Sequence, residues 1–428
     1  MKSIKILIPY PTGHETVSIR TMLFNNMIPI LKKTTNVKIQ RIIYQPEKLD
    51  GKVFENSDVE TLDLHNYENA FDVLQQEKPD LIYANPYPGF IDFAFAFSGK
   101  ILNIPVFSIL NYDSSQLNSF DSFIMNSRKL FSNFVEVEIS KNKKSFMRRA
   151  KFIFYKFSFL MKTVNSSKLR FLKKLKTILM IIKLTLRPSK IVDPRLAVTK
   201  HYLRNETQEK ELLSLGFDPT TLLVTGHPMF DQTFKKIKND KNIFNTDKIR
   251  ILFAPDPYYE SGEWTKKQHE SILSGIVKTI MKNDNQFSLT IKIHPSSTVL
   301  SEYEPIIHSI DKSIPIFQKG SIEDFLDEAD VVVSYSSQST GLVFSLIQKK
   351  PIVICNFFKV GFDNRLTDDG LAKECKDLSS LIKTIKFSVK PDELYEKRRQ
   401  DYIKKYFFKD DGLASERICN DLLNFLKT

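Results

Sequence analysis

Short apolar runs, each followed by a polar cluster, recur along the whole chain. Three of them lie in the second half, at 289–293, 331–333 and 352–355. Runs of this length that end in turn residues are typical of buried strands in a parallel sheet. Segments with helical periodicity separate the runs, so the sequence predicts an α/β protein with doubly wound parallel sheets.

The same alternation divides the chain into two halves. In the first half we expect strands at 4–9, 37–44, 80–84, 105–110, 195–199 and 222–225, and helices at 17–33, 67–78, 90–102 and 205–215. A new strand at 249–254 and a helix at 266–282 open the second half. A chain of 428 residues is long for one domain. We therefore predict an N-terminal domain at 1–235, a linker at 236–248, a C-terminal domain at 249–395, and terminal helices at 396–428.

Residues 114–190 interrupt the alternation and are interpreted as an insertion. Apolar residues recur at steps of three and four in 146–164 and again in 171–186, which predicts two amphipathic helices. Residues 141–190 contain 16 Lys and Arg and no Asp or Glu, so the rest of the chain carries 13 − 16 = −3. The basic charge is therefore local, which argues against nucleic-acid binding across the whole surface.

A basic amphipathic helix pair is suited to an anionic membrane surface, where Phe152, Tyr155 and Phe159 would widen the apolar face. The alternative is a helical hairpin that packs on the protein and leaves its lysines in water. An RNA-binding arm is a third interpretation, but it lacks a recognised motif. We expect membrane contact through 141–190 and no nucleic-acid partner.

The remaining composition indicates a cellular setting. Cys355, Cys375 and Cys419 have no metal-ligand spacing and form no even framework, which favours a reducing, intracellular environment. The amino-terminal apolar run is too short for a signal peptide. No stretch of about 18 uncharged apolar residues occurs, so we expect no spanning helix. Together with the basic segment, this predicts a cytoplasmic protein that is peripheral on the inner face of the cell membrane.

Polar clusters follow two of the predicted strands in the second half. Open α/β sheets bind ligands at the carboxyl ends of their strands. The first cluster holds His294 and Pro295, and the second holds Ser336, Ser337, Ser339, Thr340 and Gly341. Hydroxyls and free N–H groups at a helix start bind phosphate, and an imidazole can donate a hydrogen bond to it. The ordinary alternatives are helix caps and a capped turn. The sequence thus predicts a nucleotide-phosphate pocket.

Three motifs carry a resemblance to known families. Residues 224–231, VTGHPMFD, resemble the Val-Thr-Gly-x-x-x-x-Asp segment of UDP-N-acetylglucosamine 2-epimerases. Residues 292–295, KIHP, resemble the His-Pro motif of CDP-glycerol glycerophosphotransferases and bacterial sialyltransferases. Residues 334–337, SYSS, resemble the paired-serine motif of the same groups. The resemblance implies a GT-B fold, in which two Rossmann-like domains face a cleft, and a hinge that contains Gly226, His227 and Asp231.

The sequence also departs from these families. The epimerase serine loop continues with Gly-Gly and Gln-Glu-Glu, whereas 338–344 here reads QSTGLVF and contains no acid. Epimerisation is therefore disfavoured. Many GT-B transferases place a ribose-binding Glu seven residues before the proline that corresponds to Pro351, and this chain has Phe344 there. The identity of the nucleotide is therefore left open.

The resemblance suggests roles for further residues. Gly13-His14 falls where GT-B transferases often carry an acceptor-side loop, so His14 is the candidate base, with Glu15 as its alternative and Asp113 as a weaker one. His14 as a surface or capping residue is the competing interpretation. His294 is the candidate for the leaving group. Phe317 and Gln318 are candidates for clasping the nucleobase. No DxD-like motif stands out near a strand end, so we expect neither a metal nor a cofactor.

Four functions fit these observations. The first is a glycosyltransferase that moves a sugar from a nucleotide-activated donor to a membrane-proximal glycan or lipid-linked acceptor in surface polysaccharide synthesis. The second is a CDP-glycerol-type polyol-phosphate transferase on the same scaffold. A UDP-N-acetylglucosamine 2-epimerase is third, and a non-catalytic binding protein is fourth. Donor assays with UDP-, CMP- and CDP-linked compounds would separate the first two.

Overall fold

The computed structural model describes residues 3–10, 19–44, 59–85, 89–110, 143–185, 194–239, 248–260, 264–294, 300–336, 339–357 and 365–427. The contacts divide the chain into two compact units. Unit 1 comprises Met1–Asp231, Tyr406–Lys409 and Leu413–Thr428, and unit 2 comprises Gln232–Lys405 and Asp410–Gly412. The first crossing from unit 1 to unit 2 therefore lies a few residues before the expected linker at 236–248. The terminal helices are shared between the units.

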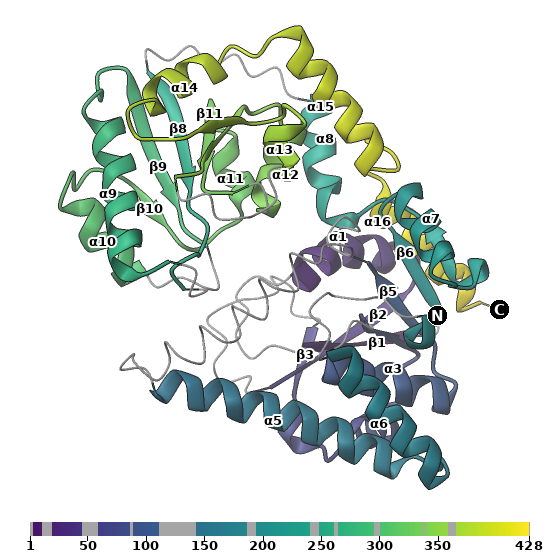
Figure 1. Ribbon diagram of the computed structural model, residues 1–428. Helices are drawn as coiled ribbons and strands as arrows, with labels where there is room; N and C mark the ends of the chain where they lie inside the picture. Colours follow the sequence, from purple (N-terminus) through teal and green to yellow (C-terminus); the bar gives the residue numbers. More distant parts are fainter. Residues whose placement is uncertain are drawn as a thin grey trace. The chain divides into compact units, whose positions relative to one another are not determined.

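Unit 1 is built on a seven-stranded parallel sheet with the order β3-β2-β1-β4-β5-β6-β7 (Figure 1). The strands are β1 (Ser3–Tyr10), β2 (Asn36–Ile43), β3 (Val59–Asp63), β4 (Leu81–Tyr83), β5 (Val106–Ile109), β6 (Lys200–Leu203) and β7 (Leu222–Val224). The helices are α1 (Ile19–Thr34), α2 (Ala70–Glu77), α3 (Phe90–Leu102), α5 (Lys143–Ser166), α6 (Phe171–Thr185), α7 (Glu206–Ser214) and α16 (Ala414–Phe425). The strand order reverses between β1 and β4, which is where open sheets of this kind bind ligands.

The basic insertion is part of the unit 1 core. Phe159, Leu160 and Val164 of α5, together with Ile181 and Leu184 of α6, are buried in one cluster with residues of α2 and α3. Burial of each such side chain stabilises the fold by about 1.5–3 kcal/mol. The expected pair of amphipathic helices is confirmed, and one face of the pair packs on the protein.

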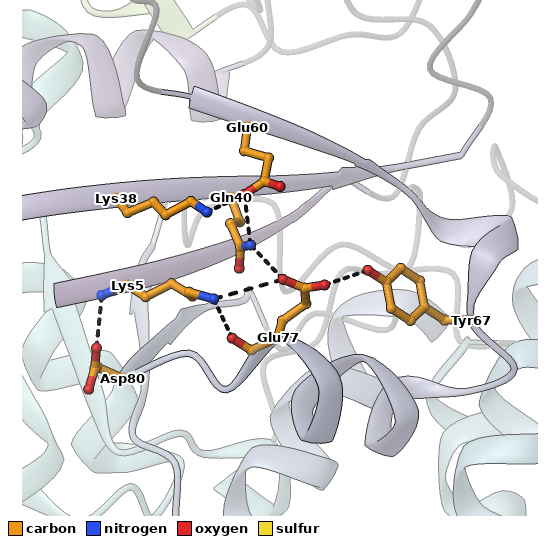
Figure 2. A network of polar contacts seen from close by, with 7 residues as sticks. All are labelled: Lys5, Lys38, Gln40, Glu60, Tyr67, Glu77 and Asp80. Carbon is orange, nitrogen blue, oxygen red and sulfur yellow. Dashed lines mark hydrogen bonds and ion pairs between the residues drawn. The ribbon is translucent and has the colours of Figure 1, made fainter. Parts of the chain in front are cut away.

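A polar network joins the strands of unit 1 to the end of α2 (Figure 2). The side-chain amide of buried Gln40 donates to Glu60 Oε2 at 3.0 Å and to Glu77 Oε2 at 2.5 Å, and Tyr67 donates to Glu77 Oε1 at 2.7 Å. Lys5 Nζ donates to the Glu77 carbonyl at 2.6 Å. Because three strands and a helix end share these bonds, the network fixes the register of β1, β2 and β3.

Unit 2 is built on a six-stranded parallel sheet with the order β10-β9-β8-β11-β12-β13 (Figure 1). The strands are β8 (Ile249–Ala254), β9 (Phe287–Lys292), β10 (Ile316–Phe317), β11 (Val331–Ser334), β12 (Ile352–Cys355) and β13 (Lys373–Cys375). The helices are α8 (Asp231–Asn239), α9 (Lys266–Met281), α10 (Leu300–His308), α11 (Ile322–Leu326), α12 (Thr340–Ile347), α13 (Arg365–Asp368), α14 (Leu381–Ser388) and α15 (Glu393–Tyr406). β8 is central, so its carboxyl end lies between those of β9 and β11.

The predicted alternation is confirmed in both units, but the strand expected at 195–199 is wrong. Residues Pro194–Leu196 form a 3-10 turn, and β6 begins only at Lys200. Proline has no N–H to donate to a strand ladder, so the chain turns there before it joins the sheet. Among the described residues, no helix is both long enough and apolar enough to cross a bilayer.

Candidate active site

The site is built on the carboxyl edge of the unit 2 sheet, where Asp256 organises the serine loop. Asp256 follows β8, and its Oδ2 accepts hydrogen bonds from the backbone N–H groups of Tyr335 at 3.2 Å and Ser336 at 3.0 Å. Ser334 Oγ lies 2.9 Å from both Asp256 Oδ2 and the Ala254 carbonyl oxygen. Asp256 therefore ties the end of β11 to the end of β8.

Burial raises the pKa of Asp256 to about 6, and its hydrogen bonds with Ser334, Ser336 and Tyr335 oppose that rise. A carboxylate removed from water favours its neutral form unless donors compensate. Asp256 is therefore close to half-protonated in mildly acidic solution.

Lys292 and His294 lie at the end of β9, two residues apart. Lys292 is buried, and its Nζ donates to the Ile293 carbonyl at 3.1 Å and to the Gln318 carbonyl at 2.9 Å. Burial lowers the pKa of Lys292 to about 8, against the opposing effect of Asp324. Loss of hydration lowers the pKa of the His294 ring, and the Lys292 charge lowers it further. The neutral form of His294, which has one N–H donor and one acceptor, is therefore favoured.

Helix α12 follows β11, so its start lies at the same carboxyl edge of the sheet. Ser339 is the N-cap of α12, and its Oγ accepts a hydrogen bond from the Gly341 N–H at 3.2 Å. A Cβ at Gly341 would lie 2.5 Å from the Ile322 methyl group Cδ1. The Ser339 hydroxyl thus caps its own helix, and Gly341 allows close packing against α11. Thr340 begins α12, whereas Pro295 and Ser337 lie outside the described residues.

Phe317 and Gln318 lie at and just beyond the end of β10. Phe317 is 42% exposed, and its ring centroid lies 4.8 Å from that of Phe325. The Gln318 carbonyl is held by Lys292, as described above. The ends of β10, β9, β8 and β11 therefore bring Gln318, His294, Asp256 and Ser336 to one edge of the sheet, in that order. The assignment of these groups to nucleobase and phosphate stays a prediction.

The acceptor-side candidates His14, Glu15 and Asp113 lie outside the described residues. Among the described residues of unit 1, Arg20 and Asp92 form a buried ion pair with N–O distances of 2.7 and 2.8 Å. Arg20 also donates to the Pro9 carbonyl, and Asp92 accepts from the Asn85 N–H at 3.0 Å. The pair joins the carboxyl end of β1 to the starts of α1 and α3.

The predicted hinge residues all belong to unit 1. Gly226 has φ of +88°, which favours glycine, and a Cβ there would lie 3.1 Å from Ala414 Cβ. Burial lowers the pKa of His227 to about 3, and its ring accepts from the Met229 N–H. Asp231 accepts from the N–H groups of Ala414 and Ser415, so it caps α16 from a distance. The described contacts of these residues are structural.

Two features of the site were missed or undervalued by the sequence analysis. Lys292 is part of the KIHP motif, and a lysine inside an otherwise apolar strand, two residues before a candidate histidine, is a usable signal of a functional role. The role of Asp256 had no such signal, because its donors come from residues about 80 positions away. The described residues contain no cluster of three or more His, Cys, Asp or Glu that could hold a metal ion.

Comparison with known families gives one match, and it includes this site. Residues 213–424 match the family described as CDP-glycerol:poly(glycerophosphate) glycerophosphotransferase. The matched segment is similar to this family and contains the whole unit 2 edge, including Asp256, Lys292, His294 and Ser336. Among curated proteins, no sequence matches the chain.

Solved structures that resemble the chain extend the comparison to both units. The UDP-N-acetylglucosamine 2-epimerase of Neisseria meningitidis, bound to UDP-GlcNAc, is 15% identical, with 99% of this chain and 100% of that chain covered and a TM-score of 0.54. The UDP-N-acetylglucosamine 2-epimerase of Methanocaldococcus jannaschii is 15% identical, with 99% of this chain and 100% of that chain covered and a TM-score of 0.53. The wall teichoic acid polymerase TagF is 11% identical, with 99% of this chain and 89% of that chain covered and a TM-score of 0.56. At this identity the likeness establishes the fold, and the GT-B prediction is confirmed.

Proposed function

We propose that this protein is a transferase that moves a polyol phosphate from a CDP-activated donor to an acceptor hydroxyl in the synthesis of a surface polymer. The observation that carries the proposal is the glycerophosphotransferase-family match over 213–424, which spans the organised edge of unit 2. The similar TagF is described as a wall teichoic acid polymerase, and one of its structures is a soak with CDPG.

The proposed reaction is a phosphoryl displacement. The acceptor hydroxyl oxygen forms a bond to the phosphorus that carries the polyol, and the bond from this phosphorus to the bridging oxygen breaks. CMP departs with that electron pair, and the acceptor proton passes to a base. The developing negative charge on CMP needs donors that are already in place. The neutral His294 ring and the N–H groups at the start of α12 are our candidates for that role.

The acceptor-side chemistry is proposed from the sequence. His14 is the candidate base that takes the acceptor proton, with Glu15 as its alternative. The described residues on either side of 11–18 are tied together, because Arg20 of α1 donates to the Pro9 carbonyl of β1 and pairs with Asp92. Neither a metal nor a cofactor is part of the proposal.

A donor panel tests the transfer directly. The protein is incubated with CDP-glycerol, UDP-N-acetylglucosamine or a CMP-linked sugar, each with a polyol-phosphate primer, and nucleotide release and primer extension are measured. We expect CMP release with CDP-glycerol, and at least a hundredfold loss in the His294→Ala variant. His308→Ala, which changes a partly exposed histidine on α10, is the matched control. If no donor turns over, the protein is a binding protein on a GT-B scaffold.

The second candidate is glycosyl transfer from a nucleotide sugar. The resemblance of 292–295 to the His-Pro motif of bacterial sialyltransferases favours this candidate. The groups at the carboxyl edge of the unit 2 sheet would stabilise a departing nucleotide phosphate equally well in a glycosyl transfer. Turnover of a nucleotide sugar but not of CDP-glycerol in the same panel would select this candidate. Incubation with UDP-N-acetylglucosamine alone tests epimerisation, which the missing acids disfavour.

We further propose that the α5–α6 pair brings unit 1 to an anionic membrane that carries the acceptor. Its outer face leaves large apolar side chains in water: Ile153, Phe154, Phe171, Leu172, Leu175 and Leu179. Phe154 is 72% exposed, Phe171 77% and Leu172 70%. The surrounding residues 141–190 carry 16 cations and no acid. Exposed aromatic and aliphatic groups within a basic segment suit the interface of an anionic bilayer.

Sedimentation with liposomes tests this surface. We expect binding to vesicles that contain phosphatidylglycerol, weaker binding to pure phosphatidylcholine vesicles, and weakening by salt. The double variant Phe154→Ser and Leu172→Ser should remain in solution, while its fold is unchanged. Leu394→Ser on α15 is the control, because Leu394 is 53% exposed but lies outside the basic segment. Equal binding by both variants would mean that the hairpin only packs on the protein.

A further inference from the structure

Lys292 joins two neighbouring strands at the edge where the donor is proposed to bind. It is the last residue of β9, and its Nζ contacts one carbonyl of its own strand end and the Gln318 carbonyl beyond β10. β9 and β10 pair in parallel, with Phe317 opposite Lys292. One ammonium group therefore fixes how far Gln318 lies from the residue that follows β9.

Burial makes the position of Lys292 energetically unfavourable for a charge. The residue is only 5% exposed, and both of its described acceptors are neutral carbonyls. Asp324 of α11 is the acid that acts on it. An apolar strand end such as the neighbouring Ile293 would pack without this cost, because a buried cation loses its hydration. A buried lysine whose pKa is lowered at a ligand-binding edge is a mark of a functional site.

His294 follows Lys292, the last residue of β9, by two residues. Loss of hydration lowers the pKa of the His294 ring most, and the charge of Lys292 lowers it further. A neutral ring can still donate one hydrogen bond and accept another, whereas a protonated ring can only donate. The lysine thus adds positive charge to the edge and disfavours a second cation at His294.

We propose that Lys292 is a positioning residue of the donor site: it ties the Gln318 segment to the end of β9, two residues before His294, where the donor phosphate is proposed to bind. This inference rests on the proposed function, because it names how that site is tuned. It predicts that removal of the charge alone, with the shape retained, changes the behaviour of His294.

Two substitutions separate charge from structure. Lys292→Gln retains an N–H donor for the Gln318 carbonyl but removes the charge, whereas Lys292→Arg keeps the charge. Lys312→Gln, an exposed lysine beyond α10, is the control. The His294 ring is followed by NMR titration and identified among the seven histidines by its loss in His294→Ala. In Lys292→Gln we expect the His294 titration to move to higher pH, and CMP affinity to fall about tenfold or more.

Turnover with the active donor provides the second readout. The acid limb of the pH–rate profile should move to higher pH in Lys292→Gln, so that the loss is larger at pH 6 than at pH 8. Lys292→Arg should keep the wild-type profile. If both the CMP affinity and the His294 titration are unchanged in folded Lys292→Gln, the inference is overturned, whether or not a donor turns over. Loss of CMP affinity without turnover of any donor retains Lys292 as a positioning residue of a nucleotide site and rejects the proposed transfer.

Discussion

At the scale of single residues, the site depends on donors that converge on one oxygen. Asp256 Oδ2 receives the N–H groups of Tyr335 and Ser336 and lies 2.9 Å from the Ser334 hydroxyl. These bonds stabilise the ionised form, yet burial outweighs them and raises the pKa of Asp256 to about 6. The ionised carboxylate is therefore retained at a net cost to stability, which is reasonable for a residue that shapes a binding loop.

This balance gives a prediction for Asp256→Asn. The folded state holds the Asp256 proton more tightly than the unfolded state, so wild-type folding takes up a proton between about pH 4 and pH 6. The free energy of unfolding of the wild type, relative to that of Asp256→Asn, should therefore fall as the pH rises through this window. The total fall should be at most about 3 kcal/mol. Urea unfolding at pH 4, 5, 6 and 7 measures it, and a constant difference would contradict the assigned burial cost.

The residues of the site were predictable to the extent that their chemistry is local. His294 and the serine cluster each follow a strand, and parallel topology places both at one edge. Which hydroxyl serves which purpose was not predictable, because Ser334 and Ser339 are used by Asp256 and by the α12 start. Hydrogen-bond partners about 80 residues away leave no trace in a local pattern.

At the scale of elements, close packing of α12 on α11 explains Gly341, which the sequence places in the predicted nucleotide-phosphate pocket. The Gly341 Cα faces the Ile322 side chain so closely that an added Cβ would lie 2.5 Å from Cδ1. The next nearest atom, Ser339 Oγ, would lie at 3.3 Å. The steric conflict therefore depends on a single methyl group at the end of the isoleucine.

The methyl group suggests a double-mutant cycle. Gly341→Ala alone should lower the free energy of unfolding by about 1 kcal/mol, because Ile322 must move. Ile322→Val removes Cδ1 and should abolish that cost, giving a coupling of about 1 kcal/mol between the two changes. Chemical denaturation measures the stabilities. If nucleotide binding is still lost in the double variant, Gly341 also serves the ligand, as the sequence analysis suggested.

The elements themselves followed closely from apolar periodicity. The strand at 249–254 and the helix at 90–102 agree with β8 and α3 to the residue. The edge strands β3 and β13 were not predicted, because sequences such as VETLD and KEC have no continuous apolar run. Edge strands are covered on fewer sides, so selection for apolar residues is weaker there. Strand β6 was misplaced because Ala197 and Val198 extend the apolar pattern into the turn that precedes it.

At the scale of the whole molecule, the chain crosses between units more than once. Helix α15 belongs to unit 2, whereas α16 belongs to unit 1, where Ile418, Cys419 and Leu422 are buried and α16 packs on α1. Asp231 caps α16 through two N–H groups, and Tyr202 donates to Asp421 at 2.8 Å. The last helix of the chain therefore completes the core of the first unit.

This arrangement predicts that a destabilising substitution in α16 lowers the stability of unit 1. Leu422→Ala, at a residue that is 2% exposed, should cost about 2–5 kcal/mol of unit 1 stability. The chain has a single tryptophan, Trp264, buried in the unit 2 core, so its fluorescence reports unit 2 alone. Far-UV circular dichroism reports both units. Leu422→Ala should therefore shift an early transition in circular dichroism and leave the Trp264 transition in place.

The matched control is Leu273→Ala in α9, which creates a cavity of the same chemistry in the unit 2 core. It should move the Trp264 transition and spare the part of the circular dichroism change that belongs to unit 1. Separate transitions are expected because each unit has its own sheet and its own buried cluster. If Leu422→Ala moves the Trp264 transition as far as Leu273→Ala does, the two units unfold as one cooperative body, and the chain crossings couple their stabilities.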